Sequence, residues 1–436
     1  MTFPVTPCYP AANTPSSGVT TTFTVAGPVA LFDPAVIGTH TTVASWDISS
    51  PTGTDDRVVN ADSITENLAL TETYTVVLTF AAGEETLVTS LNCNTDGITA
   101  LDVVALTELV SIYAYGNALT TVDVSGLASL EILSCYSNSG MTTLTLTDAT
   151  ALTFISCSAC SLSALDITAS TGLTYLSCGS NAITSLDFTG QTSLTYIECV
   201  NNSLTTMTAV TDMTALVTFY CYGNALTTVD VSGLASLGIL SCYSNSGMTT
   251  LTLTGATALT HLSCSACSLS ALDITASTGL TYLSCGSNSL TSLDFTGQTS
   301  LTYVECVNNS LTTMTAVTDM TALVTFYCYG NSLTTVDVSG LASLDTLFCY
   351  SNSGMTTADI SGTTALADFR TQGNALSAAV IDAILIQGDI DWTASGLTIQ
   401  YDIMAGDTDH DSARSSAATT AIANMSGEGW TRLGTY

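Results

Sequence analysis

Tyrosine is the residue type that most clearly marks a surface able to bind a ligand in this chain. Thirteen of the 17 tyrosines recur at three positions of a repeated segment, where they alternate with leucine and cysteine. Alternate residues of a strand point to opposite sides, so these rings should share one exposed face. Rigid tyrosine rings beside small serine and glycine residues are typical of binding surfaces. The candidate ligand-binding residues are Tyr113, Tyr115, Tyr136, Tyr175, Tyr196, Tyr220, Tyr222, Tyr243, Tyr282, Tyr303, Tyr327, Tyr329 and Tyr350.

Two interpretations of this tyrosine-rich face stay open. The rings could recognise a ligand, or they could simply stack on one another between neighbouring strands of a sheet. A glycan would fit a recognition face, because aromatic faces stack on sugar rings while serine hydroxyls and Glu198 or Glu305 form hydrogen bonds. A protein partner would fit as well.

A second series of residues with binding chemistry is acidic. An aspartate recurs after a leucine later in the repeat, and the Asx turn explains it most simply, although calcium held between neighbouring carboxylates is an alternative. A separate D-x-D-x-D run has Ser412 and Ala418 where an EF-hand loop needs Gly and Glu, so it is a weak metal candidate and we expect no metal or cofactor. The recurring aspartates are Asp102, Asp123, Asp166, Asp187, Asp230, Asp273, Asp294, Asp337 and Asp359, and the run holds Asp407, Asp409 and Asp411.

Catalytic motifs are missing from the sequence. The three histidines (His40, His261 and His410) stand in unrelated contexts, and the chain contains no lysine. No nucleophile elbow, phosphate-binding loop or zinc-protease helix motif occurs. A glycosidase-like pair of carboxylates could exist among so many aspartates, but nothing singles one out. We therefore expect a protein that is not an enzyme.

Cysteines mark the element that must position all these residues. Most of the 15 cysteines fall at one recurring position, which is the behaviour of a small buried hydrophobic residue. We expect buried free thiols and folding in a reducing cytoplasm, although adjacent strands would not place the sulfurs too far apart for bridges. Spacings of 21 or 22 residues predict a solenoid, since no single turn of that length can bury its apolar side alone. The marked positions are Cys93, Ala114, Cys135, Cys157, Cys178, Cys199, Cys221, Cys242, Cys264, Cys285, Cys306, Cys328, Cys349 and Thr371.

The full repeat is L-x-x-L-x-C-x-x-N-x-(L/I)-T-x-L-D, as in the segment from Leu173 to Asp187. It resembles the leucine-rich repeat family, with cysteine in the sixth place and a short return leg of the kind found in bacterial repeats. The resemblance implies a mainly β fold: a solenoid of about fourteen turns, with a parallel sheet on its concave face. It also implies that Asn181 and its equivalents bond the backbone of neighbouring turns.

The flanking segments differ from the repeats. All seven prolines lie between Pro4 and Pro51, and proline removes a donor from a sheet ladder. We expect a small N-terminal β-rich anchoring or capping domain at 1–85, the solenoid at 86–375 and an α+β C-terminal cap at 376–436. Strands are predicted at Thr20–Val25, Thr41–Ile48 and Tyr74–Phe80, and an amphipathic helix is predicted after Asn374.

A longer duplication lies over the short repeat. Residues 115–221 and 222–328 differ at only seven positions of 107. Such identity indicates recent duplication, and it suggests that the number of displayed sites varies. Three of the differences are Glu131 against Gly238, Asp148 against Gly255 and Phe154 against His261.

Charge and composition limit the classes of partner that the chain could bind. The net charge of −32 excludes nucleic acid and an anionic membrane surface as partners, because both need lysine and arginine. We expect no secretory signal peptide, because Met1 to Val5 has neither a basic nor an apolar region, and no run of apolar residues is long enough to span a membrane. We therefore expect a non-enzymatic structural or adhesive protein, as a bacteriophage virion fibre or decoration assembled in the host cytoplasm. It would recognise a host surface glycan or protein, and its N-terminal domain would bind virion proteins and could form a homo-oligomer. The alternatives are a bacterial cell-surface adhesin and, less favoured, a polysaccharide depolymerase.

Overall fold

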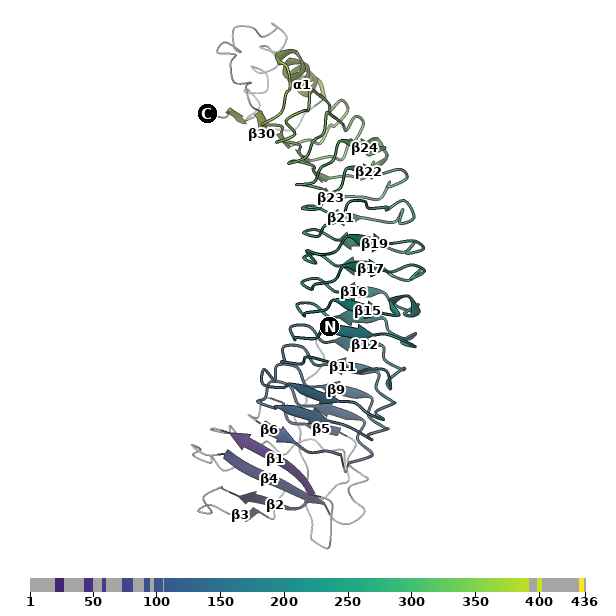
Figure 1. Cartoon of the computed structure of the whole chain (residues 1–436). Coiled ribbons are helices and arrows are strands. Elements are labelled where there is room, and N and C mark those ends of the chain that lie inside the picture. Colours follow the sequence, from purple (N-terminus) through teal and green to yellow (C-terminus); the bar gives the residue numbers. More distant parts are fainter. Residues whose placement is uncertain are drawn as a thin grey trace. The chain divides into compact units, whose positions relative to one another are not determined.

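The structure is a computed structural model that describes residues 20–26, 43–49, 57–59, 73–80, 90–94, 98–104, 106–391, 398–401 and 431–434 (Figure 1). The chain forms two compact units, Met1–Leu216 and Val217–Tyr436. The architecture is mainly β within each unit, as the repeat predicts.

The first unit begins with an antiparallel sheet whose strand order is β3-β2-β4-β1-β6. Three of its strands confirm the strands predicted before the repeats. The fifth, β6, lies inside the first repeat and pairs with β1, so this sheet extends beyond residue 85 and shares a strand with the solenoid. The strands are β1 (Thr20–Ala26), β2 (Val43–Ser49), β3 (Arg57–Val59), β4 (Thr73–Phe80) and β6 (Ile98–Leu101).

A parallel sheet with one short strand per turn follows in the first unit. Neighbouring strands pair in register, so Tyr175 lies between Phe154 and Tyr196. The return legs add β8 (Thr121–Asp123), β10 (Thr143–Thr145), β13 (Ser185–Asp187) and β15 (Thr206–Thr208), and a 3-10 turn η2 spans Val210–Asp212. The strands of the parallel sheet are β5 (Ser90–Asn92), β7 (Ser111–Tyr113), β9 (Ile132–Ser134), β11 (Phe154–Ser156), β12 (Tyr175–Ser177) and β14 (Tyr196–Glu198).

The second unit repeats this arrangement. Its parallel strands are β16 (Thr218–Tyr220), β18 (Ile239–Ser241), β20 (His261–Ser263), β21 (Tyr282–Ser284), β23 (Tyr303–Glu305), β25 (Thr325–Tyr327), β27 (Thr346–Phe348) and β29 (Asp368–Arg370). Its return legs carry β17 (Thr228–Asp230), β19 (Thr250–Thr252), β22 (Ser292–Asp294), β24 (Thr313–Thr315), η3 (Val317–Asp319), β26 (Thr335–Asp337) and β28 (Thr357–Asp359). Each of the fourteen marked repeat positions thus has its own strand, which confirms the expected number of repeats.

The repeat pattern ends near Asn374, but the parallel sheet does not. Helix α1 (Ala378–Asp391) confirms the expected helix and buries Ile381 and Ile384, but its apolar residues are spread around the helix and do not form the expected amphipathic face. Strand β30 (Thr398–Tyr401) then pairs with β29. Strand β31 (Thr431–Gly434) pairs with β30 in the same direction. A segment outside the period therefore extends the sheet, because the edge of β29 offers unpaired backbone groups to any strand.

The core of each turn holds the leucines and cysteines of the repeat. Leu173, Leu176 and Cys178 are fully buried, and Asn181 connects its turn to the preceding one. The Asn181 side-chain nitrogen donates to the carbonyls of Cys157 (2.9 Å) and Cys178 (3.0 Å), as predicted for this position. Its side-chain oxygen accepts the backbone N–H of Leu162 at 3.0 Å. These hydrogen bonds hold neighbouring turns together and so keep the strands of the sheet in a fixed position relative to the core. In the part of the chain that the structure describes, no helix has the length and apolar character to cross a membrane.

Candidate binding face

The candidate binding face is the outward side of the parallel strands in each unit. Three outward positions recur in every turn: the first strand residue, the third strand residue and the residue after the inward cysteine. In the Cys178 turn they are Tyr175, which is half-buried, and Ser177 and Gly179, which are buried by their neighbours on the same face. Leu176 and Cys178 point to the opposite side of the strand and are fully buried in the core. Parallel pairing in register places equivalent positions of adjacent turns side by side, at about 4.8 Å. Each outward position therefore forms a column across the sheet.

The first column carries continuous stacks of aromatic rings. The Tyr175 ring lies 4.4 Å from Phe154 and 4.6 Å from Tyr196 between centroids, with interplanar angles of 7° and 3°. In the second unit the His261 and Tyr282 rings stack at 4.1 Å, and the Tyr282 and Tyr303 rings stack at 4.7 Å. The interpretation that tyrosines stack between adjacent strands is confirmed.

The third column carries three separate stacked pairs of tyrosines, and the second column carries Tyr113, Tyr220 and Tyr327. All thirteen candidate tyrosines therefore belong to the three outward columns. Each ring of such a pair has one face against its partner, whereas Tyr175 and Tyr282 of the first column are stacked on both faces. The pairs are Tyr115 with Tyr136 at 4.6 Å, Tyr222 with Tyr243 at 4.3 Å and Tyr329 with Tyr350 at 4.3 Å.

Burial raises the pKa of three phenols of the first column above the ordinary value of about 10. It is the largest cause of the raised pKa of Tyr175 and Tyr282, and the charge of a nearby glutamate adds to it in both cases. For Tyr303, burial followed by the charges of Tyr282 and Glu305 raises the pKa to about 12. The hydroxyls therefore stay protonated at neutral pH and can both donate and accept hydrogen bonds.

A polar row runs beside the first-column stack in each unit. The Ser158 and Ser177 hydroxyl oxygens are 2.8 Å apart, and Ser177 donates to Oε2 of Glu198 at 2.7 Å. Ser265, Ser284 and Glu305 make the same row in the second unit. The sequence singles out these serines and glutamates only as candidate hydrogen-bonding groups, and the structure joins them into two equivalent clusters.

Glycine gives the glutamate its space, which the sequence analysis missed. A Cβ atom on Gly179 would lie 2.8 Å from Oε1 of Glu198 and 3.0 Å from Cγ2 of Val200. A Cβ atom on the corresponding Gly286 would lie still closer to Oε1 of Glu305. The sequence does contain a sign of this arrangement. Gly179 and Gly286 stand in the third column, where tyrosine is the most frequent residue, and a glutamate follows one turn later in each case.

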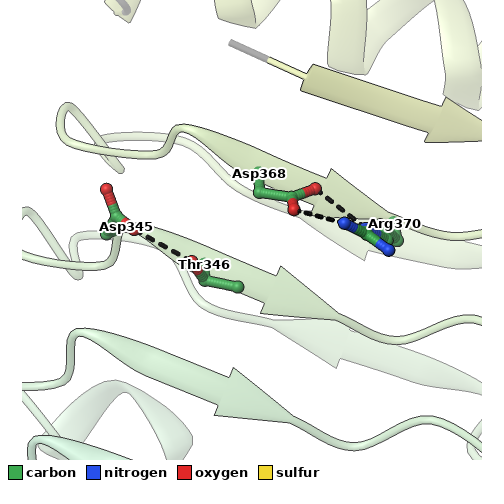
Figure 2. A network of polar contacts seen from close by, with 4 residues as sticks. All are labelled: Asp345, Thr346, Asp368 and Arg370. Carbon is green, nitrogen blue, oxygen red and sulfur yellow. Dashed lines mark hydrogen bonds and ion pairs between the residues drawn. The ribbon is translucent and has the colours of Figure 1, made fainter. Parts of the chain in front are cut away.

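In the parallel sheet of the second unit, the carboxylate of Asp368 forms an ion pair with Arg370. Figure 2 shows Arg370 donating to Asp368, with Nε 3.1 Å from Oδ1 and Nη2 2.7 Å from Oδ2. The Arg370 guanidinium also lies 4.2 Å from the centroid of the Phe348 ring. Its pKa is raised, first by the hydrogen bond to Asp368. On the preceding strand, Thr346 donates to Asp345 at 2.9 Å.

The aspartates of the return legs accept hydrogen bonds from residues of their own turns. Oδ1 of Asp187 accepts the backbone N–H of Thr189 at 3.0 Å and the hydroxyl of Thr189 at 2.7 Å, and Thr208 donates to it at 2.9 Å. The hydroxyl bond of Thr189 is the largest cause of the lowered pKa of Asp187. The turn interpretation is confirmed, and equivalent bonds surround Asp123, Asp166, Asp230, Asp273 and Asp294.

Metal ligation has little support in the described structure. Within the described ranges, no group of three or more His, Cys, Asp or Glu side chains is placed to hold a metal ion. Asp407, Asp409 and Asp411 lie outside the described residues.

The inward cysteines are buried thiols, as expected. Cys135, Cys157 and Cys178 are fully buried, and burial is the largest cause of pKa values well above the usual range. A thiol that stays protonated is a poor nucleophile and a poor metal ligand. Thirteen of the fourteen cysteines of the described ranges are buried and Cys267 is half-buried, so the inward thiols pack the core.

No protein-family model matches the chain, and no curated protein matches it. Several solved structures, however, are similar to this chain. A functional domain of InlJ from Listeria monocytogenes, described as including a cysteine ladder, is similar with 28% identity and a TM-score of 0.56. That match covers 68% of this chain and 61% of the InlJ chain, so this chain spans less than two thirds of that relative.

The internalin InlF from Listeria monocytogenes shares the fold, with 20% identity and a TM-score of 0.52 over 65% of this chain and 90% of that one. These likenesses agree with one buried strand per turn of 21 or 22 residues and with asparagine bonds between turns. The chain has the leucine-rich repeat fold.

Proposed function

We propose that this chain is a non-enzymatic binding protein that recognises a protein partner through the outward face of its parallel strands. The stacking of the aromatic rings carries the proposal. Phe154 and Tyr196 cover both faces of the Tyr175 ring, so a sugar could not stack on it without separating the rings. Around such a ring the edges, the hydroxyl and the neighbouring carboxylates remain, and these groups suit the polar and charged surface of a protein.

The likeness to InlJ supports presentation at a bacterial surface. Delivery on a bacteriophage virion stays a prediction from the sequence, motivated by the block duplication and the buried thiols. Fractionation of the source material separates the two. Mass-spectrometric enrichment with cell envelopes supports the adhesin, whereas enrichment with capsid proteins would favour the virion fibre.

The binding face can be tested by removing hydroxyls while keeping the rings. In the variant Tyr175→Phe/Tyr196→Phe/Tyr282→Phe/Tyr303→Phe, the stacks should persist and hydrogen bonds to a partner should be lost. The control, Thr121→Val/Thr228→Val, removes two exposed hydroxyls from the return legs. The natural chain and both variants are then screened against a displayed peptide library and a glycan array.

Peptides that bind the natural chain and the threonine control but not the tyrosine variant would support the proposal. Glycans with that behaviour would show that the partner class is wrong. Ligands of either class that bind all three proteins equally would exclude the tyrosine columns as the binding face.

A further inference from the structure

Glu198 and Glu305 are the carboxylates of the two polar rows described above. Each is half-buried on the outward side of a strand, and each has its Oε2 atom bonded to a serine hydroxyl. No hydrogen bond from a described residue reaches the Oε1 atom of either glutamate. Each cluster therefore holds an anionic group with unused capacity to accept hydrogen bonds.

The protein supplies no cation to either cluster among its described side chains. Arg370 is the only lysine or arginine whose side chain the structure describes, and it is bonded to Asp368. The chain as a whole has no lysine and a net charge of −32. Half-burial of a carboxylate without a cation costs free energy, which an incoming cation would recover.

The same sheet in the second unit shows how a cation is accommodated. The Arg370 guanidinium lies between a carboxylate, Asp368, and an aromatic ring, Phe348. Glu198 and Glu305 also lie on strands that carry stacked aromatic rings, but the hydrogen bonds to their carboxylates come from serine hydroxyls. Gly179 and Gly286 make room for the carboxylates themselves, because a Cβ atom at either glycine would collide with Oε1.

We propose that Glu198 and Glu305 each bind a lysine or arginine side chain of the protein partner. The ammonium or guanidinium group would donate to Oε1, and the serine hydroxyls would hold the carboxylate in place. The duplication therefore provides two equivalent cation-binding subsites, both unchanged between the blocks. This inference rests on the proposed protein-binding function and specifies the chemistry of the partner.

The test uses a peptide of alternating lysine and threonine, with a norleucine–threonine peptide as the neutral probe. Binding to the full chain is measured by calorimetry at low salt in the presence of EDTA, which removes divalent cations. The variant Glu198→Gln/Glu305→Gln is compared with Asp123→Asn/Asp230→Asn. Both variants lose two negative charges at duplicated positions, but the second pair lies on return legs and asparagine can retain the turn bonds.

We expect the glutamine variant to bind the lysine peptide about tenfold more weakly, as for the loss of one charged hydrogen bond. The asparagine variant should bind within about twofold of the natural chain, because exposed charges contribute little. Gly179→Ala/Gly286→Ala should weaken binding as well, because a new methyl group displaces each carboxylate. Carbodiimide coupling of the peptide should join its lysines to Glu198 and Glu305.

Equal weakening by the glutamine and asparagine variants would overturn the proposal, since the peptide would then sense only net charge. Failure of the natural chain to bind the lysine peptide better than the neutral one would overturn it too. Peptides selected in the library screen with the tyrosine variant distinguish the two proposals. If such a peptide needs the tyrosine hydroxyls but binds the variant Glu198→Gln/Glu305→Gln as well as the natural chain, the binding face is supported and the cation subsites are ruled out.

Discussion

The turns β9 to β14 and the turns β18 to β23 have almost the same sequence but differ at a few informative positions. Phe154 and His261 both stack on the next tyrosine, at 4.4 Å and 4.1 Å. Asp148 and Gly255 both adopt a left-handed conformation, with φ values of 62° and 84°. The fold therefore imposes one geometry on different side chains, and each difference between the blocks probes how well a residue suits that geometry.

The largest effect should come from the core shared by the two blocks. Leu176 and Leu283 are fully buried, and Leu→Ala at either position should destabilise the protein by about 2–5 kcal/mol through lost burial and a cavity. Leu176 pairs with Ile155 and Ile197, and Leu283 pairs with Leu262 and Val304. Urea denaturation should therefore give losses within about 1 kcal/mol of each other. A much larger difference would show that the turns do not behave as equivalent units.

Removing a buried asparagine should have the next largest effect. The side chain of Asn138 accepts the Leu119 N–H and donates to the Ala114 and Cys135 carbonyls. Asn138→Ala, like Asn245→Ala in the sister block, should cost about 3 kcal/mol because buried backbone groups lose their partners. Cys160 takes the equivalent place in the next turn with only two long sulfur contacts of 3.5 Å and 3.6 Å. Cys160→Ala should therefore shift the urea midpoint much less, and an equal shift would contradict this account.

Exchanging Asp148 and Gly255 should have a smaller effect of opposite sign in the two blocks. An L-residue with positive φ is strained, and a Cβ on Gly255 would lie 3.2 Å from the Cα of Gly233. Asp148→Gly should stabilise the protein by about 1 kcal/mol, and Gly255→Asp should destabilise it by a similar amount. Thermal denaturation of both variants measures this, and equal signs would show that the local surroundings of the two turns differ.

The smallest effect should be the pH dependence caused by His261. Burial lowers the pKa of His261, so the unfolded chain takes up the proton at a higher pH than the folded chain does. The contribution of neutral His261 to stability is therefore complete above its ordinary pKa of about 6.5 and is lost as the pH falls through it. His261→Phe should raise the melting temperature more at pH 5 than at pH 8. Phe154→His should produce the reverse change, and a shift independent of pH would exclude titration of this ring.

Much of the fold was predictable because each repeat carries the same pattern of inward and outward residues at a fixed spacing. Leu173, Leu176 and Cys178 recur at fixed spacing, and burial of their described equivalents in the other turns follows from that period. The turn role of Asp187 also followed from local sequence, because an aspartate two residues before a threonine can bond its backbone and hydroxyl. The extension of the sheet by β30 and β31 could not be foreseen, since pairing with β29 needs only a free strand edge and no repeat signal.

The sequence by itself determined which side chains share the outward face, because strand alternation and a constant period place Tyr175, Ser177 and Gly179 there in known order. Only the tertiary structure decided how they are used. Strands in register at about 4.8 Å bring the rings of Phe154, Tyr175 and Tyr196 face to face, which removes those faces from ligand binding. The same spacing lets Glu198 reach back over Gly179 to the serine of the preceding turn. A period gives the position of a residue within its turn, whereas contacts between turns depend on side-chain conformation and on what the adjacent strand leaves free.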